Sequence, residues 1–449
     1  MKLAFIALIF ILTSTQGWAS VRAYFNHNQN KSYIDPYRGI TRSGDNLEQV
    51  LIDEVNKAKK SIFIAVQEFR LPLLAQALKK KKAAGIDIRV VLENDYNSTV
   101  LGSIDYEQDH HDAVRSTDLR ALVDINQDGK LSKNEIEARD AVHILRSARI
   151  PVMDDTMDDS SGAGLMHHKF VVIDGNTTIV STANFTLSCV HGDFRTPSSR
   201  GNPNSMTVIK SAAVAKIFSE EFSQMWGNGK VGNFGQNKLY RGPQTVNIRG
   251  TDITIQFSPT SARQSWQGSV NGLTASILEK SKKSIKAALF VFSDQTLANV
   301  MEKRHLDGVE IGVLIEPKFA FRAYSELLDM LGLKMLNENC SYEPDNRPWK
   351  KKAEEVGMAL LPGGDILHHK FAVVDGKTVI VGSQNWTDAA NLSNDETLLI
   401  IHNKSISDQY TQEYNRVLSS SQLGALPRIK EEIARKKEKC ASSLFQQQD

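Results

Sequence analysis

A nine-residue pattern occurs twice in this 449-residue chain. Each copy begins with a histidine and has a lysine two positions later, then four mostly apolar residues and an Asp-Gly pair. On a β-strand, residues two positions apart project from the same face. We therefore expect His167 and Lys169 to point the same way, and His368 and Lys370 to do likewise. The second histidine of each copy, His168 or His369, would face the opposite side and pack or hydrogen-bond within the sheet.

The Asp-Gly pair of each copy predicts a tight hairpin turn, held by Asp174 in the first and Asp375 in the second. The returning segments place a hydroxyl and an amide two residues apart, again on one face. An imidazole, an ammonium, a hydroxyl and an amide on one hairpin form a set that suits an anionic phosphate to be held and attacked. The hydroxyl and amide residues are Thr182, Asn184, Ser383 and Asn385.

The duplication extends well beyond these hairpins. Residues 51–62 and 274–285 each read as an amphipathic helix entering a strand, and residues 85–93 and 308–316 each read as an apolar strand. Helices alternating with apolar strands predict an α/β fold with sheets covered on both faces. Between its apolar strand and its histidine, the first half is longer than the second by about 22 residues.

The extra residues contain a twelve-residue segment, 124–135, that fits the EF-hand calcium loop. Gly129 falls at the sharp turn, and helical stretches flank the loop. We expect calcium binding with a structural or regulatory role, and a polar turn between two helices is the alternative. The ligand positions are filled by Asp124, Asn126, Asp128, Lys130 through its backbone carbonyl, Ser132 and Glu135.

Composition and the N-terminal residues indicate the class of protein and its expected location. A formal charge of +2 and 41% hydrophobic residues are ordinary for a globular protein and do not by themselves indicate a nucleic-acid partner. Residues 1–19 have a basic start, a short apolar run and a small-residue end, which predict a secretory signal peptide, with a membrane anchor as the alternative. We therefore expect a secreted or periplasmic protein with no stable membrane span.

Three cysteines cannot all pair within one chain. A Cys340–Cys440 bond is compatible with an oxidising compartment, although the spacing does not indicate it. Cys189 is interpreted as a small buried residue.

The two His-x-Lys motifs resemble those of the phospholipase D superfamily. The family motif continues to Gly-Ser-x-Asn, which residues 382–385 match fully and residues 181–184 match with Thr182 in place of serine. Residues 63–69 look like the first core strand of secreted bacterial phosphodiesterases and nucleases of this superfamily. The resemblance implies two pseudo-twofold-related α-β-α sandwich domains in a monomer that acts as an internal pseudo-dimer. The expected segments are a first domain at 20–245 with a helical EF-hand insertion at 110–147, a second domain at 252–420, and a charged tail at 421–449 that forms an exposed, fraying helix.

The family mechanism implied by this resemblance is hydrolysis through a covalent phosphohistidine. Family precedent makes His167 the nucleophile and His368 the acid and base, and needs no catalytic cofactor or metal. The family also places a carboxylate after each motif to orient an imidazole. Glu396 matches in the second half, and its position after His368 could argue for the reverse roles. In the first half, an alignment of residues 204–208 on 394–398 puts Met206 at that position, and Asp193 is a candidate substitute.

Two classes of phosphodiester, nucleic acid and phospholipid, remain as candidate substrates, and nucleic acid is slightly favoured. A nuclease predicts a basic groove, although the acidic run 154–159 opposes it. A phospholipase predicts exposed apolar loops, for which residues 319–321 and Trp386 are candidates. A calcium-dependent binding module without catalysis is a third, less favoured interpretation. The candidate groove cations are Arg70, Arg195, Arg200, Lys318 and Arg322.

Overall fold

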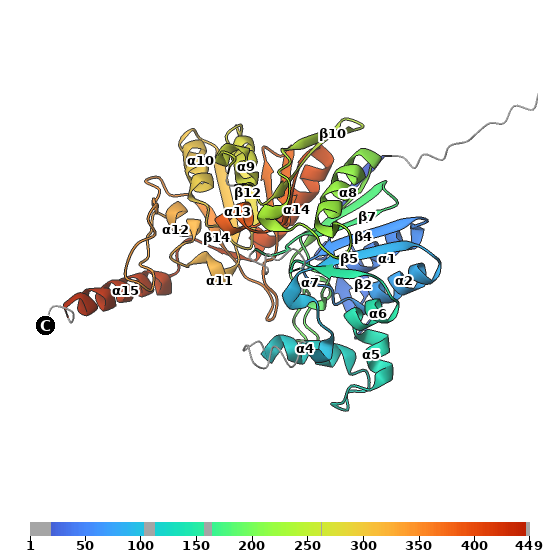
Figure 1. Ribbon diagram of the computed structural model, residues 1–449. Helices are drawn as coiled ribbons and strands as arrows, with labels where there is room; N and C mark the ends of the chain where they lie inside the picture. The colour runs from blue at the N-terminus through green and yellow to red at the C-terminus, as the bar shows by residue number, and fades with distance from the viewer. Residues whose placement is uncertain (1–18, 103–112, 157–163, 262, 446–449) are drawn as a thin grey trace, which may run out of the picture.

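Two sheets, one from each half of the chain, form the frame of the molecule (Figure 1). The structure is a computed structural model that describes residues 19–102, 113–156, 164–261 and 263–445. The predicted signal peptide lies outside the described residues except for Ala19. The first three residues of the predicted insertion and the last four of the predicted tail also lie outside them.

The first sheet has seven strands in the order β1-β9-β8-β7-β4-β5-β6. The pairs β4–β5 and β5–β6 are parallel, and the other neighbours are antiparallel. A separate hairpin, β2–β3, lies outside it. The strands are β1 Ser20–Phe25, β2 Ser32–Ile34, β3 Thr41–Ser43, β4 Ser61–Val66, β5 Asp87–Leu92, β6 Val152–Asp154, β7 Lys169–Ile173, β8 Thr177–Ser181 and β9 Ser205–Lys210.

The second sheet repeats this order as β11-β17-β16-β15-β12-β13-β14 and adds β10 at one edge and β18 at the other. The duplicated order confirms the predicted α/β fold class. Because β10 pairs with β11, residues 244 and 245 pack with the second half. The strands are β10 Gln244–Ile248, β11 Thr251–Ser258, β12 Ser284–Leu289, β13 Glu310–Ile315, β14 Glu355–Ala359, β15 Lys370–Val374, β16 Thr378–Gly382, β17 Glu396–His402 and β18 Ser421–Leu423.

Helices connect the strands and pack on the sheets (Figure 1). In the first half, α1 and α2 pack together, and α8 contacts β4, β7, β8 and β9. The longer helices of the two halves are α1 Leu47–Lys57, α2 Pro72–Ala83, α8 Ala212–Trp226, α9 Val270–Leu278, α10 Gln295–Leu306, α14 Lys404–Ser419 and α15 Pro427–Phe445. The shorter ones are α6 Ala141–Ser147, α7 Leu187–Val190, α11 Pro317–Ala320, α12 Glu326–Met330 and α13 Asp388–Leu392. Single 3₁₀ turns are η1 Asn94–Tyr96, η2 Gly235–Asn237 and η3 Trp266–Gly268.

The two hairpins are fixed at their turns by the aspartates of the repeated motif. Asp174 has a φ of 52°, and its carboxylate accepts hydrogen bonds from the backbone N–H groups of residues 59–61. Asp375 has a φ of 54° and accepts from residues 282–284. Each carboxylate therefore ties its hairpin to the start of the adjacent strand, β4 or β12.

A continuous apolar core joins the two halves. It contains side chains from both sheets and from α8 and α14, including Phe170, Phe257, Phe371 and Tyr410. Tyr410 packs edge-on against Phe25 and Phe371, with ring centroids 4.9 and 5.0 Å apart. Since burial of such rings is the main source of stabilisation in a core, the two lobes are held face to face by the hydrophobic effect.

The insertion is a small helical unit beside the first lobe (Figure 1). Helices α4 Ala113–Val123 and α5 Lys133–Arg139 flank the loop, and α5 starts with a capping box formed by Ser132 and Glu135. Leu119 and Val123 pack with Val100 in a small apolar cluster of their own. The loop therefore has the helix–loop–helix form that its sequence predicts.

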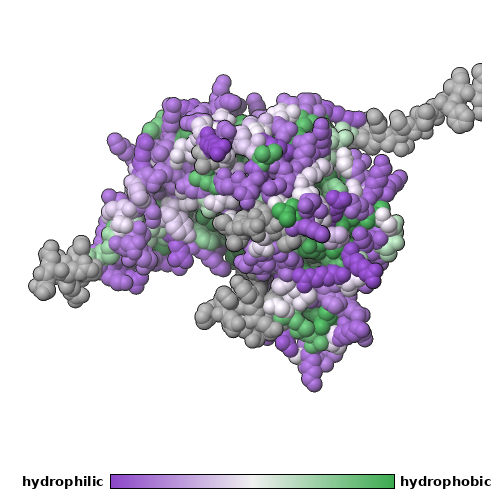
Figure 2. All heavy atoms as spheres, viewed as in Figure 1, coloured by the Kyte–Doolittle hydropathy of each residue, from purple (hydrophilic) through white to green (hydrophobic). Residues whose placement is uncertain are grey.

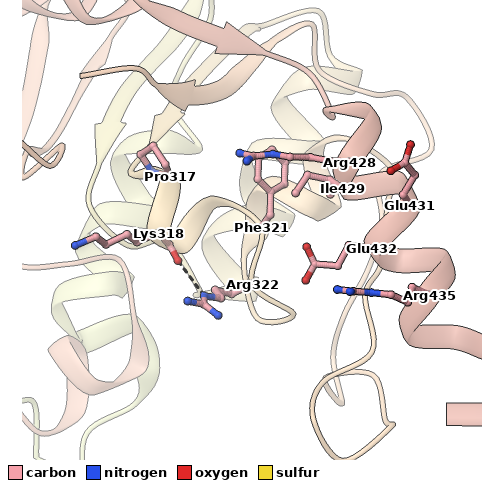
Figure 3. Close-up of a pocket in the computed structure, with 9 residues that line it drawn as sticks. All are labelled: Pro317, Lys318, Phe321, Arg322, Arg428, Ile429, Glu431, Glu432 and Arg435. Carbon is pink, nitrogen blue, oxygen red and sulfur yellow. Dashed lines mark hydrogen bonds between the residues drawn. The ribbon is translucent and has the colours of Figure 1, made fainter. Parts of the chain in front are cut away.

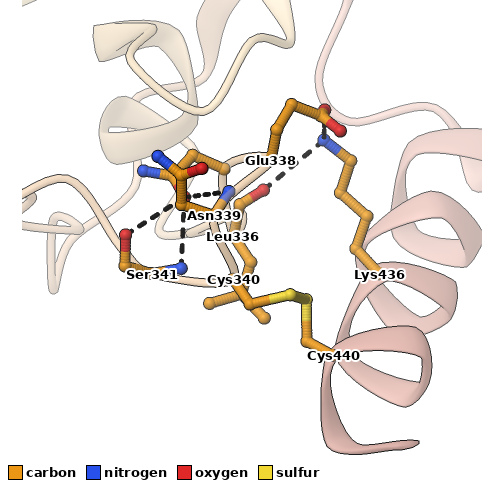
Figure 4. Close-up of a disulfide and its surroundings, with 8 residues drawn as sticks. Leu336, Glu338, Asn339, Cys340, Ser341, Lys436 and Cys440 are labelled. Carbon is orange, nitrogen blue, oxygen red and sulfur yellow. Dashed lines mark hydrogen bonds and ion pairs between the residues drawn. A yellow bond between two sulfur atoms is a disulfide. The ribbon is translucent and has the colours of Figure 1, made fainter. Parts of the chain in front are cut away.

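The C-terminal helix differs from the exposed, fraying helix that its charge pattern predicts. Cys440 of α15 forms a disulfide with Cys340, with the Cα atoms 5.5 Å apart (Figure 4). Its apolar side is buried through Ile429 and Ile433. The bond is the pairing that the sequence allowed without indicating it, and Cys189 is free and buried.

Among the described residues, no helix is both long and apolar enough to cross a membrane. The face shown in Figure 2 is mostly hydrophilic, with apolar patches among larger hydrophilic areas.

Candidate active site

The two His-x-Lys motifs meet where the lobes face each other. His167 precedes β7 and His368 precedes β15, and both side chains are buried. A β-bridge between Met166 and Asp395 joins the two motif regions across the lobes. The pKa of each histidine is lowered well below its usual value by burial and then by the positive charges of Lys169 and Lys370. The positive charges of the lysines of both halves therefore act on each imidazole.

His167 is oriented by a residue from the other lobe. Its Nδ1 lies 2.7 Å from Oε2 of Glu396, which is the first residue of β17. The backbone N–H of His167 donates to the carbonyl of Asp395 at 3.0 Å. Burial raises the pKa of Glu396 to about 7, and the ammonium of Lys169 opposes this shift. With Nδ1 bonded to the carboxylate, Nε2 of His167 is free to face a substrate.

His368 makes the equivalent contact with an uncharged group. Its Nδ1 lies 3.0 Å from Oδ1 of Asn204 in the first lobe. The amide oxygen of Asn204 is an acceptor, so Nδ1 carries the proton here too. Each histidine is thus held by the opposite lobe, one by a carboxylate and the other by an amide.

The strand register corrects the alignment that put Met206 at the Glu396 position. The backbone N–H of Thr182 donates to the carbonyl of Ser205, and that of Ser383 donates to the carbonyl of Thr397. Asn204 is therefore the structural counterpart of Glu396. The equivalence is hidden in the sequence because the loop before β9 is longer than the loop before β17.

Asp193, the other candidate for orienting His167, lies in a different environment. Its backbone N–H donates to the Ser199 hydroxyl, and its carbonyl accepts from Arg38. Burial, followed by the charges of Asp118 and Asp365, raises the pKa of Asp193 to about 6.

The two lysines lie beneath the histidines as buried cations. Nζ of Lys169 donates to the carbonyl of His167 at 2.7 Å, and Nζ of Lys370 donates to the carbonyl of His368 at 2.9 Å. Burial lowers the pKa of Lys169 to about 8 and lowers that of Lys370 well below its usual value. Because a bound anion would offset the cost of burying these charges, the two lysines favour the binding of a phosphate at this site.

The hydroxyls of the two motifs support the residues that orient the histidines. Thr182 Oγ1 donates to Oδ1 of Asn204 at 2.8 Å, and its oxygen accepts from the N–H of Ser205. Ser383 Oγ accepts from the N–H of Thr397 at 2.9 Å, and its hydroxyl hydrogen-bonds Glu396. Sequence reasoning expected both hydroxyls to contact phosphate. Both lie buried behind Asn204 and Glu396 in this structure.

The two motif asparagines have unpaired oxygens. Among the described residues, Oδ1 of Asn184 and Oδ1 of Asn385 are buried without a hydrogen-bond partner. Since the two ends of an amide differ only in assignment, either residue can turn its NH₂ toward this position. An anionic oxygen placed there would satisfy both groups, which fits their predicted role.

The second histidine of each motif hydrogen-bonds a glutamate of its own lobe, and His168 also contacts the other lobe, with its Nδ1 2.8 Å from Thr397 Oγ1. His168 Nε2 lies 3.3 Å from Glu221 on α8, and His369 Nε2 lies 2.6 Å from Glu413 on α14. His168, Glu221 and Asp395 also have the spacing of a metal site. Lys238 fills this position, since its Nζ pairs with Glu221 and lies 2.7 Å from Asp395.

His368 opens onto a cavity of about 510 Å³. His368 and Asn184 lie in its wall, together with Lys318. Helix α4 of the insertion forms another part of the wall, so the predicted calcium loop is attached to one side of the site. The remaining lining residues include apolar Leu119, Leu122, Leu187, Phe194, Phe290 and Ile366, and acidic Glu68, Asp118 and Asp193.

The predicted groove cations separate into two groups. Arg70 is buried and donates to the carbonyl of Ser98, so it is part of the protein interior. Arg195, Arg200, Lys318 and Arg322 are exposed, and Lys318 lines the cavity.

The candidate apolar loop residues mostly belong to the core. Trp386 is 1% exposed and packs against Phe292, and Ala320 is fully buried. Phe319 is half-buried against Phe290, with ring centroids 4.8 Å apart. In the acidic run, Asp155 is buried and accepts from the N–H of Met166, and residues 157–159 lie outside the described residues.

The loop at 124–135 has the donor chemistry and backbone of a calcium loop. Gln127 and Gly129 have φ values of 58° and 80°, which turn the chain back on itself. Asp124 accepts from the N–H groups of Asp128 and Gly129, and Glu135 accepts from those of residues 125 and 126. Hydrogen bonds, first from the Ser132 side chain and then from backbone N–H groups, lower the pKa of Glu135 to about 2. These oxygens are of the hard type that Ca²⁺ prefers.

Two duplicated α/β lobes with one His-x-Lys motif each define a protein with a single composite site. A family model described as "Cardiolipin synthase, PLD-like domain" matches residues 51–226 and 275–418. These ranges cover most of both lobes, and the chain therefore belongs to this family of PLD-like proteins.

Individual relatives are more distant. The chain is 28% identical over 143 residues to a mitochondrial cardiolipin hydrolase of Xenopus tropicalis, covering 31% of this chain and 57% of that protein. It is 26% identical over 145 residues to a phospholipase D of Rickettsia typhi, covering 32% and 61%. The chain thus spans less than two thirds of the length of these curated relatives.

A solved structure supports the fold. The phosphatidylserine synthase of Haemophilus influenzae Rd KW20 superposes with a TM-score of 0.56 at 13% identity, covering 89% of this chain and 92% of that one. At this identity the likeness concerns the fold alone.

Proposed function

We propose that this protein is a phosphodiesterase that hydrolyses its substrate through a covalent phosphohistidine. The observation that carries the proposal is the reciprocal arrangement of His167 and His368, each held at Nδ1 by the opposite lobe above a buried lysine. Two imidazoles with free Nε2 atoms can divide one displacement into two steps.

The different partners of the two histidines support different roles for them. Attack by Nε2 of His167 on phosphorus forms an N–P bond and leaves positive charge on the ring, which the carboxylate of Glu396 stabilises. The bond from phosphorus to the leaving oxygen breaks, and that oxygen takes the proton from Nε2 of His368. His368 faces only the amide of Asn204, so it gives up a proton more readily than His167 does.

The second step reverses the proton transfer. His368 takes a proton from water, the resulting hydroxide oxygen attacks phosphorus, and the N–P bond breaks to restore His167. Lys169 and Lys370 stabilise the negative charge on the phosphoryl oxygens in both steps. We expect these ammonium groups to make a catalytic metal unnecessary.

Nucleic acid is the favoured substrate. Exposed Lys318 lies in the wall of the cavity, and Arg322 follows it on the same segment. Cations beside a phosphodiester site stabilise neighbouring phosphates of a polynucleotide.

A phospholipid is the second candidate, and a separate observation favours it. The cavity wall combines apolar Leu119, Leu122 and Phe194 with the carboxylates of Asp118 and Asp193. Such a wall suits a lipid glycerol and a cationic head group. The curated relatives named cardiolipin hydrolase and phospholipase D agree with this alternative.

Calcium binding at residues 124–135 and secretion complete the proposal. Bound calcium would be held by Asp124, Asn126, Asp128, the Lys130 carbonyl and Glu135, with Ser132 as a further donor, and would stiffen the link between α4 and α5. The Cys340–Cys440 disulfide supports an oxidising compartment, in line with the predicted signal peptide.

The test is an assay of the mature protein on single-stranded DNA, RNA and cardiolipin vesicles, each with and without EDTA. His167→Ala and His368→Ala serve as paired variants. Turnover that survives EDTA and is lost in both variants is the expected result, and the substrate turned over identifies the class. Turnover that persists in either variant would overturn the two-histidine mechanism.

A further inference from the structure

We propose that the groove between α11 and the disulfide-bound helix α15 holds phosphates of a nucleic-acid strand whose reacting phosphodiester lies at His167 and His368. This inference rests on the proposed function, because it names how the favoured substrate is held outside the catalytic cavity.

The groove is a cavity of about 530 Å³ with an excess of positive charge. Figure 3 shows Arg428 and Arg435 extending from α15 toward the segment that carries Arg322. The lining contains four cations and two carboxylates, Lys318, Arg322, Arg428 and Arg435 against Glu431 and Glu432.

The four cations are available to a ligand. All four side chains are exposed. Within the part of the chain that the structure describes, none of them forms an ion pair, and Arg322 Nε donates to the carbonyl of Lys318 at 2.9 Å. Since unpaired guanidinium groups match phosphate geometry with two parallel hydrogen bonds, the chemistry that fits this surface is a row of phosphates.

The groove lies next to the catalytic cavity, with Lys318 between them. Lys318 lines both cavities, and the residue after it, Phe319, packs on Phe290. The Phe290 ring in turn lies 5.1 Å from the imidazole of His368. On the inner side, the carboxylate of Glu316 accepts from the N–H of Leu367, next to His368. Lys318 is therefore part of both walls, and a strand that runs from His368 past Lys318 would enter the groove.

Helix α15 presents its arginines from a fixed position. The Cys340–Cys440 bond and the contact of Lys436 Nζ with Glu338 Oε1, 3.0 Å away, hold the helix against the 336–341 loop (Figure 4). Ile429 and Ile433 are buried on its apolar side. Arg428 and Arg435 are seven residues apart, so they lie on one face, about 10 Å apart along the axis. A pre-positioned pair of cations binds phosphates with little entropic cost.

The same helix provides a matched control. Lys430 and Lys437 are exposed and also seven residues apart, and neither lines the groove. Arg428→Ala/Arg435→Ala and Lys430→Ala/Lys437→Ala therefore remove the same charge at the same spacing from different faces.

The experiment measures binding of a fluorescent 20-nucleotide single strand by anisotropy over a range of salt concentrations, in the full-length mature protein carrying His167→Ala. The groove pair is expected to weaken binding at least tenfold and to reduce the slope of log K against log salt by about 1.4, the value for two lost phosphate contacts. The control pair is expected to change neither quantity appreciably. Equal weakening in both pairs, or none in either, would overturn the groove assignment. Binding of cardiolipin vesicles is measured in the same variants. If the groove pair lost vesicle binding and retained oligonucleotide binding, the assignment would also be overturned.

A second readout separates this inference from the proposed function. In the active protein, the groove pair should raise KM for the oligonucleotide and leave hydrolysis of the small diester bis(p-nitrophenyl) phosphate at the parent level. If the parent hydrolyses neither compound, the proposed function fails, and the binding measurement still decides the groove. A loss of small-diester hydrolysis in the groove pair would overturn the inference, because it would assign Arg428 or Arg435 to the chemistry.

Discussion

Glu396 and Asn204 occupy equivalent positions in the two lobes and differ by one ionisable group. Burial raises the pKa of Glu396 to about 7, so its carboxylate form is lost as the pH falls through that value. If the carboxylate stabilises charge on His167, the rate should fall on the acid side of about pH 7. His167 and Glu396 titrate as a pair, and the observed midpoint belongs to both.

Glu396→Gln tests this dependence. The amide keeps the size of the side chain but cannot compensate the charge on His167, so kcat should fall by about 100- to 10,000-fold and the acid limb near pH 7 should disappear. The measurement is the pH profile of kcat on the small diester, with circular dichroism to verify the fold. A variant with the rate and profile of the parent would show that Glu396 does not act on His167.

Asn204→Asp introduces the missing carboxylate at His368. A negative charge 3.0 Å from Nδ1 stabilises the imidazolium, so the pKa of His368 should rise by about 1–3 units. Because His368 must be protonated to release the leaving group, the basic limb of the kcat profile should move to higher pH. Asn204→Ala removes the contact without adding charge and should not move the limb upward. An unchanged basic limb in Asn204→Asp would remove His368 from the acid role.

The sequence was sufficient to predict the fold class and the histidine and lysine pairs as candidates, because a two-residue period on a strand converts directly into a shared face. It could not reveal which residue holds each histidine. His167 is bound to Glu396 and His368 to Asn204 across the lobe interface, and such contacts depend on how two whole sheets dock. The role of Thr182 and Ser383 could not be predicted for the same reason. These hydroxyls support Asn204 and Glu396, whose positions depend on the register of β9 and β17.

At the scale of elements, the loop at 124–135 and helix α4 connect the insertion to the site. Leu119 and Leu122 of α4 line the cavity, and Asp118 accepts from the N–H of Phe194 in the same wall. A ligand that orders the loop would therefore also stabilise this part of the cavity.

Calcium is expected to raise the melting temperature of the protein through this loop. A ligand that binds only the folded state adds about 2.7 kcal/mol at a concentration 100 times its Kd. Glu135→Gln should abolish the calcium-dependent shift, since it removes the carboxylate that closes the loop, whereas Glu137→Gln on the same helix should retain it. The measurement is differential scanning fluorimetry with calcium and with EDTA. A full shift in Glu135→Gln would place calcium elsewhere.

Helix α15 is an element whose packing could not be predicted from the sequence pattern. Its charged residues suggest a solvated helix, and its few apolar residues are easily overlooked. The disulfide joins residues 100 positions apart, a separation that gives no local signal. Only the folded second lobe shows that α15 packs beside α11 and forms a groove.

For the whole molecule, a buried charge cluster around Lys238, which lies between α8 and β10, joins the two lobes. Lys238 pairs with Glu221 on α8 of the first lobe, and with Asp395 at 2.7 Å in the second. Burial raises the pKa of Asp395 even beside this ammonium, whereas Lys238 and the other cations near Glu221 outweigh burial and lower its pKa. Against the effect of burial, Asp395 and then Glu221 raise the pKa of Lys238, so its ammonium stabilises carboxylates of both lobes.

Lys238→Met should reduce the free energy of unfolding by about 3 kcal/mol at pH 7, because it leaves a buried carboxylate without its main partner. Arg241 still pairs with Glu221, which limits the loss. A depressed pKa stabilises the fold above the unfolded value, near 4.3, and this stabilisation is lost as the pH falls. Because the loss begins only below about pH 4.3, the difference between parent and variant should be full at pH 6 and smaller at pH 3. Urea unfolding at both pH values measures it, with Lys230→Met, an exposed lysine, as the control. An equal loss at both pH values would mean that packing of the lysine stem, and not its charge, joins the two lobes.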